Sequence, residues 1–82
     1  NPFNPNTKIS FILSEPANID LSVYNLKGQK VKTLDRSFRK EGKVTVEWNG
    51  TDENGTPVSS GVYFCNLSNG RESLVKKMVM LK

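Results

Sequence analysis

The sequence predicts an all-β domain, an immunoglobulin-like or fibronectin III-like β-sandwich of about seven short antiparallel strands. Three observations support this prediction. Apolar and polar residues alternate with period two along most of the chain, turns rich in glycine, asparagine and proline separate these runs, and no long stretch has a helical period. Antibody domains have a characteristic pair of cysteines around a tryptophan, and this chain lacks that framework. The likeness to immunoglobulins is therefore one of architecture.

The first half of the chain is expected to form three strands. The first carries Ile9, Phe11 and Leu13 on one face, and the second carries Ile19, Leu21 and Val23 in the same way. Residues 25–28 form a tight turn in which Gly28 supplies a positive φ. A third strand then starts near residue 29.

The third strand is predicted to contain an irregularity. Its apolar residues Val31 and Leu34 are three positions apart, which breaks the period of two. A regular strand would place these two side chains on opposite faces. We therefore expect a β-bulge or a bend near Thr33.

The second half begins with a turn at residues 39–42 and a half-buried strand bearing Val44, Val46 and Trp48. Residues 49–61 form the longest loop, in which we expect consecutive turns and one short strand at 57–58. Residues 62–67 are apolar on both faces, which predicts a central strand. Asn69 and Gly70 predict a type I′ hairpin turn, and the last strand then covers residues 72–81.

Three residue types that could take part in binding or chemistry are instead assigned to the core. Trp48 alternates in step with Val44 and Val46, which favours burial over an exposed, sugar-stacking position. Met78 and Met80, two positions apart, are expected to fill the core. Cys65 is the one cysteine, so it forms no internal disulfide, and we expect a buried, inert thiol.

Composition excludes several classes of function. The chain has 82 residues, enough for one small domain, and a net charge of +4 from scattered lysines and arginines without interleaved aromatic residues, so no nucleic-acid site is expected. It contains no histidine, which removes the commonest general base and metal ligand. Neither a transmembrane segment nor a signal peptide is visible. We predict no catalytic residues, no cofactor and no enzymatic activity.

One loop raises the possibility of calcium. Residues 52–55, Asp-Glu-Asn-Gly, resemble half of a calcium-binding loop, although the further oxygen ligands of such a loop do not follow. Asp52 and Asn54 are equally suited to bond their own backbone in a turn. Turn formation is the preferred interpretation, and the sequence leaves calcium binding by these two residues open.

The amino-terminal residues Asn1, Pro2, Phe3, Asn4 and Pro5 form a distinct lead-in. Proline fixes its own φ and favours an extended residue before it, so this segment is expected to be stiff and non-helical. We divide the chain into a lead-in over residues 1–7 and a sandwich over residues 8–82, together one domain.

Four blocks of the sequence resemble a known family. NPFNPNTKISFIL, VYNLKGQKVKTL, VEWNGTDENGTPVSSGVYF and the terminal KKMVMLK together resemble the type A C-terminal sorting domain of the type IX (Por) secretion system. The part from VYN to GVY is also similar to the immunoglobulin-like domain of the flagellar hook-capping protein. The resemblance covers essentially the whole chain. Asn49, where the family more often has Asp, and Cys65, where an aromatic residue is common, depart from the family's pattern.

The resemblance implies a secretion signal that directs an attached cargo across the outer membrane of a Gram-negative, Bacteroidetes-like bacterium. The implied partners are the outer-membrane translocon and shuttle proteins, a surface sortase, and anionic lipopolysaccharide on the processed cargo. The cargo would end secreted or at the cell surface, having passed through the periplasm. In this interpretation the domain is the tail of a longer secreted precursor, and residues 1–5 mark the junction with the cargo.

The resemblance also assigns residues. Its terminal recognition motif falls on Lys77, Met78, Met80 and Lys82, with Leu81 in the apolar register. Its structural glycines fall on Gly28, Gly50, Gly55 and Gly61, to which the predicted hairpin adds Gly70. On physical grounds alone, the last strand could extend a partner's sheet, or Lys76, Lys77 and Lys82 could merely protect an exposed edge. The alternative function is an immunoglobulin-like stalk or glycan-binding accessory module of a secreted enzyme or adhesin.

Overall fold

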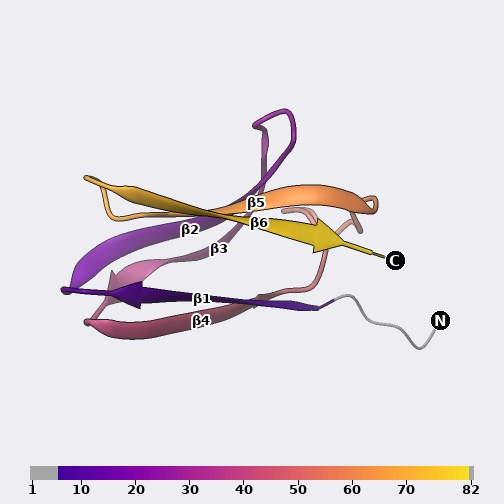
Figure 1. Cartoon of the computed structure of the whole chain (residues 1–82). Helices are drawn as coiled ribbons and strands as arrows, with labels where there is room; N and C mark the ends of the chain where they lie inside the picture. Colours follow the sequence, from indigo (N-terminus) through magenta and orange to yellow (C-terminus); the bar gives the residue numbers. More distant parts are fainter. Residues whose placement is uncertain (1–5, 82) are drawn as a thin grey trace.

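The computed structural model describes residues 6–81, and these residues form six antiparallel strands (Figure 1). The predicted all-β class is confirmed. No helix of a length and apolarity suited to crossing a membrane occurs among the described residues. The strands are β1 Thr7–Leu13, β2 Ala17–Asn25, β3 Lys30–Arg39, β4 Gly42–Trp48, β5 Gly61–Ser68 and β6 Ser73–Met80.

The strands form two sheets that face each other across the core. One sheet contains β1 and β4, and the other has the strand order β3-β2-β5-β6. The short turn after β3 carries the chain from the larger sheet to β4 in the smaller one. Six strands form where about seven were expected, because the predicted short strand at 57–58 is reduced to a single bridge between Thr51 and Pro57.

The irregularity predicted in the third strand is confirmed. The pairing of β2 with β3 shifts register twice, between Leu21 and Ser22 and again between Val23 and Tyr24. The shifts leave Leu34 and Val31 of β3 without direct partners on β2. Both side chains pack against the core as partly buried residues. The two bulges therefore turn two residues that alternation would separate toward the same interior.

Two asparagines shape the hairpins through their side chains. The amide oxygen of Asn25 accepts hydrogen bonds from the backbone N–H groups of Lys27 and Gln29, at 2.9 and 3.0 Å. Gly28 closes this turn with φ 81°, as expected.

The hairpin between β5 and β6 also forms, but the predicted type I′ turn is wrong. That turn requires a positive φ at Asn69, whereas positive φ occurs only at glycines in the described chain. The turn instead spans residues 69–72. The Asn69 side chain caps the N–H groups of Arg71 and Glu72.

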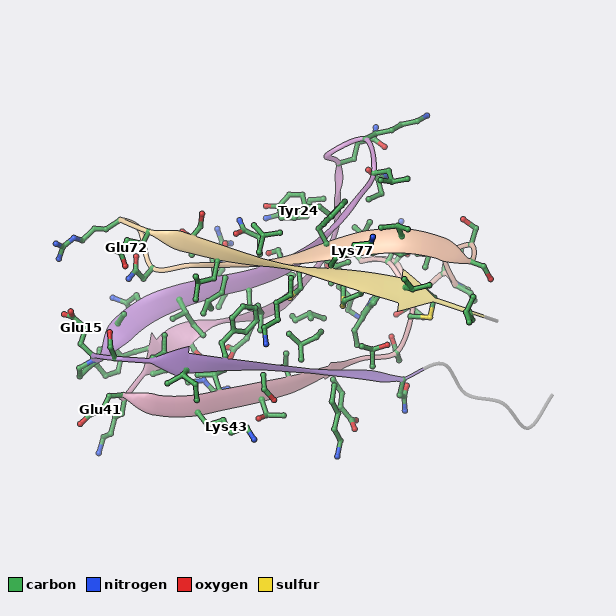
Figure 2. All side chains as sticks on the ribbon, in the orientation of Figure 1. Glu15, Tyr24, Glu41, Lys43, Glu72 and Lys77 are labelled. Carbon is green, nitrogen blue, oxygen red and sulfur yellow. The ribbon has the colours of Figure 1, made fainter. Side chains whose placement is uncertain are left out.

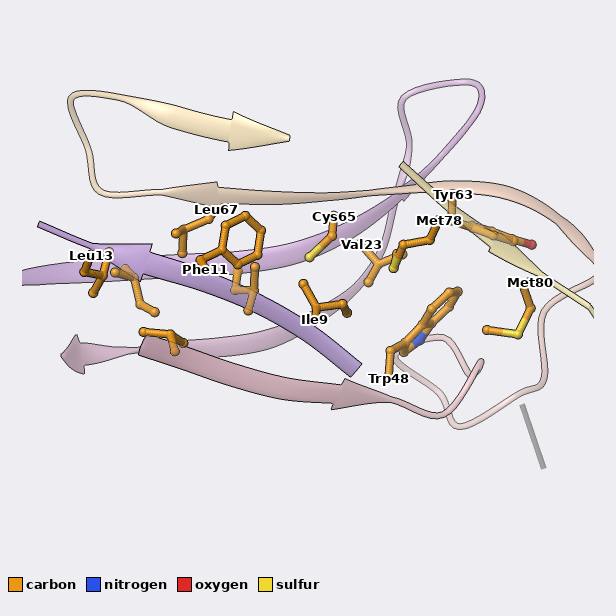
Figure 3. Packing of buried hydrophobic residues seen from close by; sticks show 13 residues of the cluster. Ile9, Phe11, Leu13, Val23, Trp48, Tyr63, Cys65, Leu67, Met78 and Met80 are labelled. Carbon is orange, nitrogen blue, oxygen red and sulfur yellow. The ribbon is translucent and has the colours of Figure 1, made fainter. Parts of the chain in front are cut away.

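The core lies between the two sheets and confirms the predicted burial of Trp48 (Figure 3). Trp48 has no exposed surface, and its ring meets Tyr63 edge-on with centroids 5.1 Å apart. Its indole Nε1–H donates to the carbonyl oxygen of Thr51 at 2.8 Å. Trp48 therefore connects the end of β4 both to the opposite sheet and to the loop that follows. Among residues 6–81, thirteen hydrophobic residues are buried: Ile9, Phe11, Leu13, Ile19, Leu21, Val23, Val44, Trp48, Tyr63, Cys65, Leu67, Met78 and Met80.

Replacing Trp48 should test how far the fold depends on it. Trp48→Ala should lower the free energy of unfolding by about 3–5 kcal/mol, because it leaves a cavity between the sheets. Trp48→Phe should cost about 1–3 kcal/mol, chiefly because it leaves the Thr51 carbonyl without its donor. Urea unfolding followed by far-UV circular dichroism measures both. Ile12→Ala, at an exposed position of β1, is the matched control. Similar losses in Trp48→Ala and Ile12→Ala would contradict the central role of Trp48.

Candidate functional site

The loop that raised the possibility of calcium is held by its own backbone. Asp52 Oδ1 accepts hydrogen bonds from the N–H groups of Asn54 and Thr56, at 2.9 and 3.0 Å. Gly55, with φ 81°, lets the loop fold back so that its N–H bonds the carbonyl of Asp52. Among residues 6–81 no group of three histidine, cysteine or carboxylate side chains is placed to hold a metal ion. The side chain of Asp52 thus stabilises this turn.

Cys65 lies in the middle of β5 with no exposed surface, which confirms its predicted burial. Burial raises the pKa of its thiol from the ordinary value of 9.0 to about 11, although the nearby positive charge of Lys76 opposes this rise. The reactive form of cysteine is the thiolate, so the native thiol is protonated and inert at neutral pH.

The Cys65 thiol should report unfolding. In native buffer at neutral pH, a thiol reagent such as DTNB should label it at least about 1,000-fold more slowly than in concentrated urea, because labelling requires opening of the sandwich. Absorbance at the reagent's product band measures the rate. Rapid labelling of the native chain would contradict the burial.

The raised pKa of Cys65 also has a consequence for stability at alkaline pH. The unfolded chain loses the thiol proton at lower pH than the native chain does. This group's contribution to stability is therefore present below about pH 9 and declines between about 9 and 11.

The residues assigned to terminal recognition do not share one surface. Met78 and Met80 point inward and are buried, which confirms that they fill the core. Lys77 points outward and Leu81 is exposed. Lys82 and the lead-in residues 1–5 lie outside the described part of the chain. The predicted structural glycines, at positions 28, 50, 55, 61 and 70, all adopt positive φ, as does Gly42.

Lys76 and Lys77 are neighbours in sequence with different environments. Lys76 stands opposite the buried Cys65 in the β5–β6 register, so its side chain lies on the inner side of the sheet. Its ammonium donates a hydrogen bond to the backbone carbonyl of Ser10 on β1 and sits 5.1 Å from the centre of the Phe11 ring. Lys76 thus bridges the two sheets where the sandwich is open between β6 and β1.

The two lysines form a matched pair for mutation. Lys76→Met should lower the free energy of unfolding by about 1 kcal/mol, because it removes the hydrogen bond to Ser10 and the cation–π contact with Phe11. Lys77→Met should change it by less than about 0.5 kcal/mol, as is usual for exposed positions. Urea unfolding measures both variants. Equal effects would show that the contacts of Lys76 contribute nothing to stability.

Lys77 belongs to a row of side chains on the outer face of the larger sheet. Phe64 stands directly opposite Tyr24 on β2 and opposite Lys77 on β6. Figure 2 shows Tyr24 and Lys77 on the side of the molecule away from Lys43. Beside Lys77 on the same face, Val75 and Val79 are about 60% exposed. This outer face therefore combines aromatic and aliphatic groups with the ammonium of Lys77 at one end of the row and that of Lys30, opposite Tyr24, at the other.

The outer face contains a shallow hollow of about 370 Å³ that includes Tyr24, Leu26, Phe64, Asn66 and Val75 in its lining. Asn66 Oδ1 is buried there without a hydrogen-bond partner. This surface is not among the features predicted from the sequence. The one signal for it is the apolar character of both faces of residues 62–67, which correctly predicts a central strand, β5, but does not indicate the outer face of β6.

Comparison with known proteins gives a consistent result. A family model described as the FlgD Ig-like domain matches residues 2–73. The solved structure of FlgD from P. aeruginosa is similar, with a TM-score of 0.73, 22% identity, and coverage of 92% of this chain and 59% of that chain.

FlgD from Xanthomonas campestris, whose structure is described in connection with hook capping in flagellar assembly, gives a TM-score of 0.70 and 20% identity. The similarity covers 94% of this chain and 56% of that one. The chain thus spans a little over half the length of these two proteins. No curated protein sequence matches it significantly.

These findings overturn the assignment to the type IX sorting domain. The implied partners (translocon, shuttle, sortase and lipopolysaccharide) and the Bacteroidetes-like source lose their basis, because both the family model and the similar structures are of FlgD. The glycan-binding stalk loses support too, since Trp48 is buried. The blocks behind the resemblance perform structural tasks in this chain: they contain the Asn25–Gly28 turn, Trp48, and Tyr63, whose hydroxyl donates to the Ser59 carbonyl at 2.7 Å. The similarity noted for the segment from VYN to GVY is the part that is confirmed: the chain belongs to the family of FlgD Ig-like domains.

Proposed function

We propose that the chain is a non-catalytic structural domain of a FlgD-type hook-capping protein. The observation that carries this proposal is the family match over residues 2–73, supported by a fold that superimposes on two FlgD structures over more than nine tenths of the chain. In this role the domain acts after export, outside the cell at the flagellar hook. The function of the domain there is to make contacts with other proteins.

The chemistry of the chain supports a role in binding. The sequence contains no histidine, and its one cysteine is a buried thiol with a raised pKa, so neither the usual base nor an activated thiolate is available. In the long loop, the side chain of Asp52 bonds two backbone N–H groups and sets a turn. What the domain offers to other molecules is sheet surface: exposed valines, aromatic rings and a free strand edge.

The proposal is tested in the bacterium that encodes the chain. Deleting the segment for this domain from its gene should abolish hook formation, scored by electron microscopy of cells and by loss of swimming. Re-expression of the intact protein should restore hooks, as should the surface variant Lys43→Glu. Trp48→Asp, which places a charge in the core, should not. Normal hooks after deletion, or a bacterium that builds no flagellar hook, would refute the proposal.

A further inference from the structure

The described part of the sandwich has four strand edges, at β1, β3, β4 and β6, and the β3 edge is obstructed. On β3, two bulges interrupt the strand, and the long loop bonds its outer side: Glu53 N–H donates to the Val31 carbonyl at 3.1 Å, and Thr33 N–H donates to Glu53 Oε2 at 2.7 Å. On β1, the Ser10 carbonyl already accepts a hydrogen bond from Lys76. Bulges and a covering loop, as found on β3, are usual means by which proteins block edge pairing.

The β6 edge is regular, unlike that of β3, and it carries more exposed apolar side chains than β1 or β4. Its eight residues pair with β5 in one continuous register, without a bulge. No other strand of the described chain pairs with its far side. An unpaired, regular edge presents alternate backbone N–H and C=O groups that another extended chain can bond. In the described part of the molecule, β6 is therefore a regular edge whose outer side is open to an added strand.

The side chains of β6 determine which peptide strands can pair favourably with its edge. On the outer face its residues read Val75, Lys77, Val79, two exposed apolar groups around one ammonium. Lys77 has no ion pair or hydrogen bond with any described residue, and its cross-strand neighbour is Phe64. A directly opposite carboxylate on an added strand would pair with Lys77, and apolar residues two positions either side would lie beside the valines.

A second copy of the chain fits this edge poorly. Two β6 strands paired antiparallel around a two-fold axis, with their outer faces continuous and fully overlapped, place Lys76 opposite Lys76 or Lys77 opposite Lys77. Like charges directly opposite each other destabilise a sheet. The net charge of +4 on each copy adds to the repulsion.

We propose that the free edge of β6 binds an extended peptide segment of the pattern apolar-x-acidic-x-apolar, with the acidic side chain opposite Lys77 and the apolar side chains beside Val75 and Val79. Main-chain hydrogen bonds would supply affinity, and the central charge would set the register. This inference goes beyond the proposed function and does not rest on it, because it derives from the strand edge and its exposed side chains.

The probe is an acetylated, amidated peptide of sequence TVTETVT, titrated into the ¹⁵N-labelled chain and followed by NMR. Amide shifts should concentrate on β6 and its neighbour β5. The peptide with lysine in place of glutamate should bind at least about five-fold more weakly, as attraction changes to repulsion. The glutamate peptide with methylated backbone amides should not bind, since it cannot donate main-chain hydrogen bonds to β6.

The decisive variant is Lys77→Glu, which should reverse the preference, so that the lysine peptide binds better than the glutamate peptide. Lys43→Glu, an equal change of charge on the two-stranded sheet, should leave the original preference intact. The same spectra show that both variants are folded. The proposal is overturned by shifts centred on another strand, by equal binding of the two peptides, by no binding of either, or by a dimer of the chain formed through β6.

Discussion

The packing of Trp48 against the opposite sheet is the contact on which the rest of the structure depends. The ring fills the end of the core beside Tyr63, while its N–H holds the first residues of the long loop. That loop in turn reaches back to β3 through Glu53. One side chain thus links the smaller sheet, the larger sheet and the loop that joins β4 to β5. In a chain of this size without a disulfide, such a shared contact replaces a covalent constraint.

Much of this arrangement follows from local patterning. Alternation correctly predicts that Ile9, Phe11 and Leu13 share one face. The break in alternation between Val31 and Leu34 correctly predicts an irregular third strand, because a bulge allows two residues at this spacing to face the same side of the sheet. The type I′ turn was mispredicted for a definable reason: the Asn69 side chain satisfies two backbone N–H groups itself. An Asn-Gly sequence can form either a type I′ turn or a turn capped by the asparagine side chain. Which turn forms depends on hydrogen bonds that cannot be read from the order of the residues.

The candidate surface was less predictable than the fold. Adjacent lysines, 76 and 77, look equivalent in sequence, yet strand geometry places one against β1 and the other beside exposed valines. Which side of β6 is covered depends on the smaller sheet, whose position is a tertiary property. Family assignment failed for a related reason. Short blocks rich in turn and core residues report the architecture that several families share, whereas a model of the whole domain separates those families.

The bulges of β3 have a consequence for assembly. A sheet that is open at both margins can join copies of itself without end, as fibres do. Here one margin is closed by bulges and by the loop bonds of Glu53, and the other carries lysines that disfavour self-pairing. Within the described residues, the larger sheet therefore has one margin for strand addition: it can receive a single extended segment there and then end. Strand addition through this sheet does not propagate into an open-ended polymer.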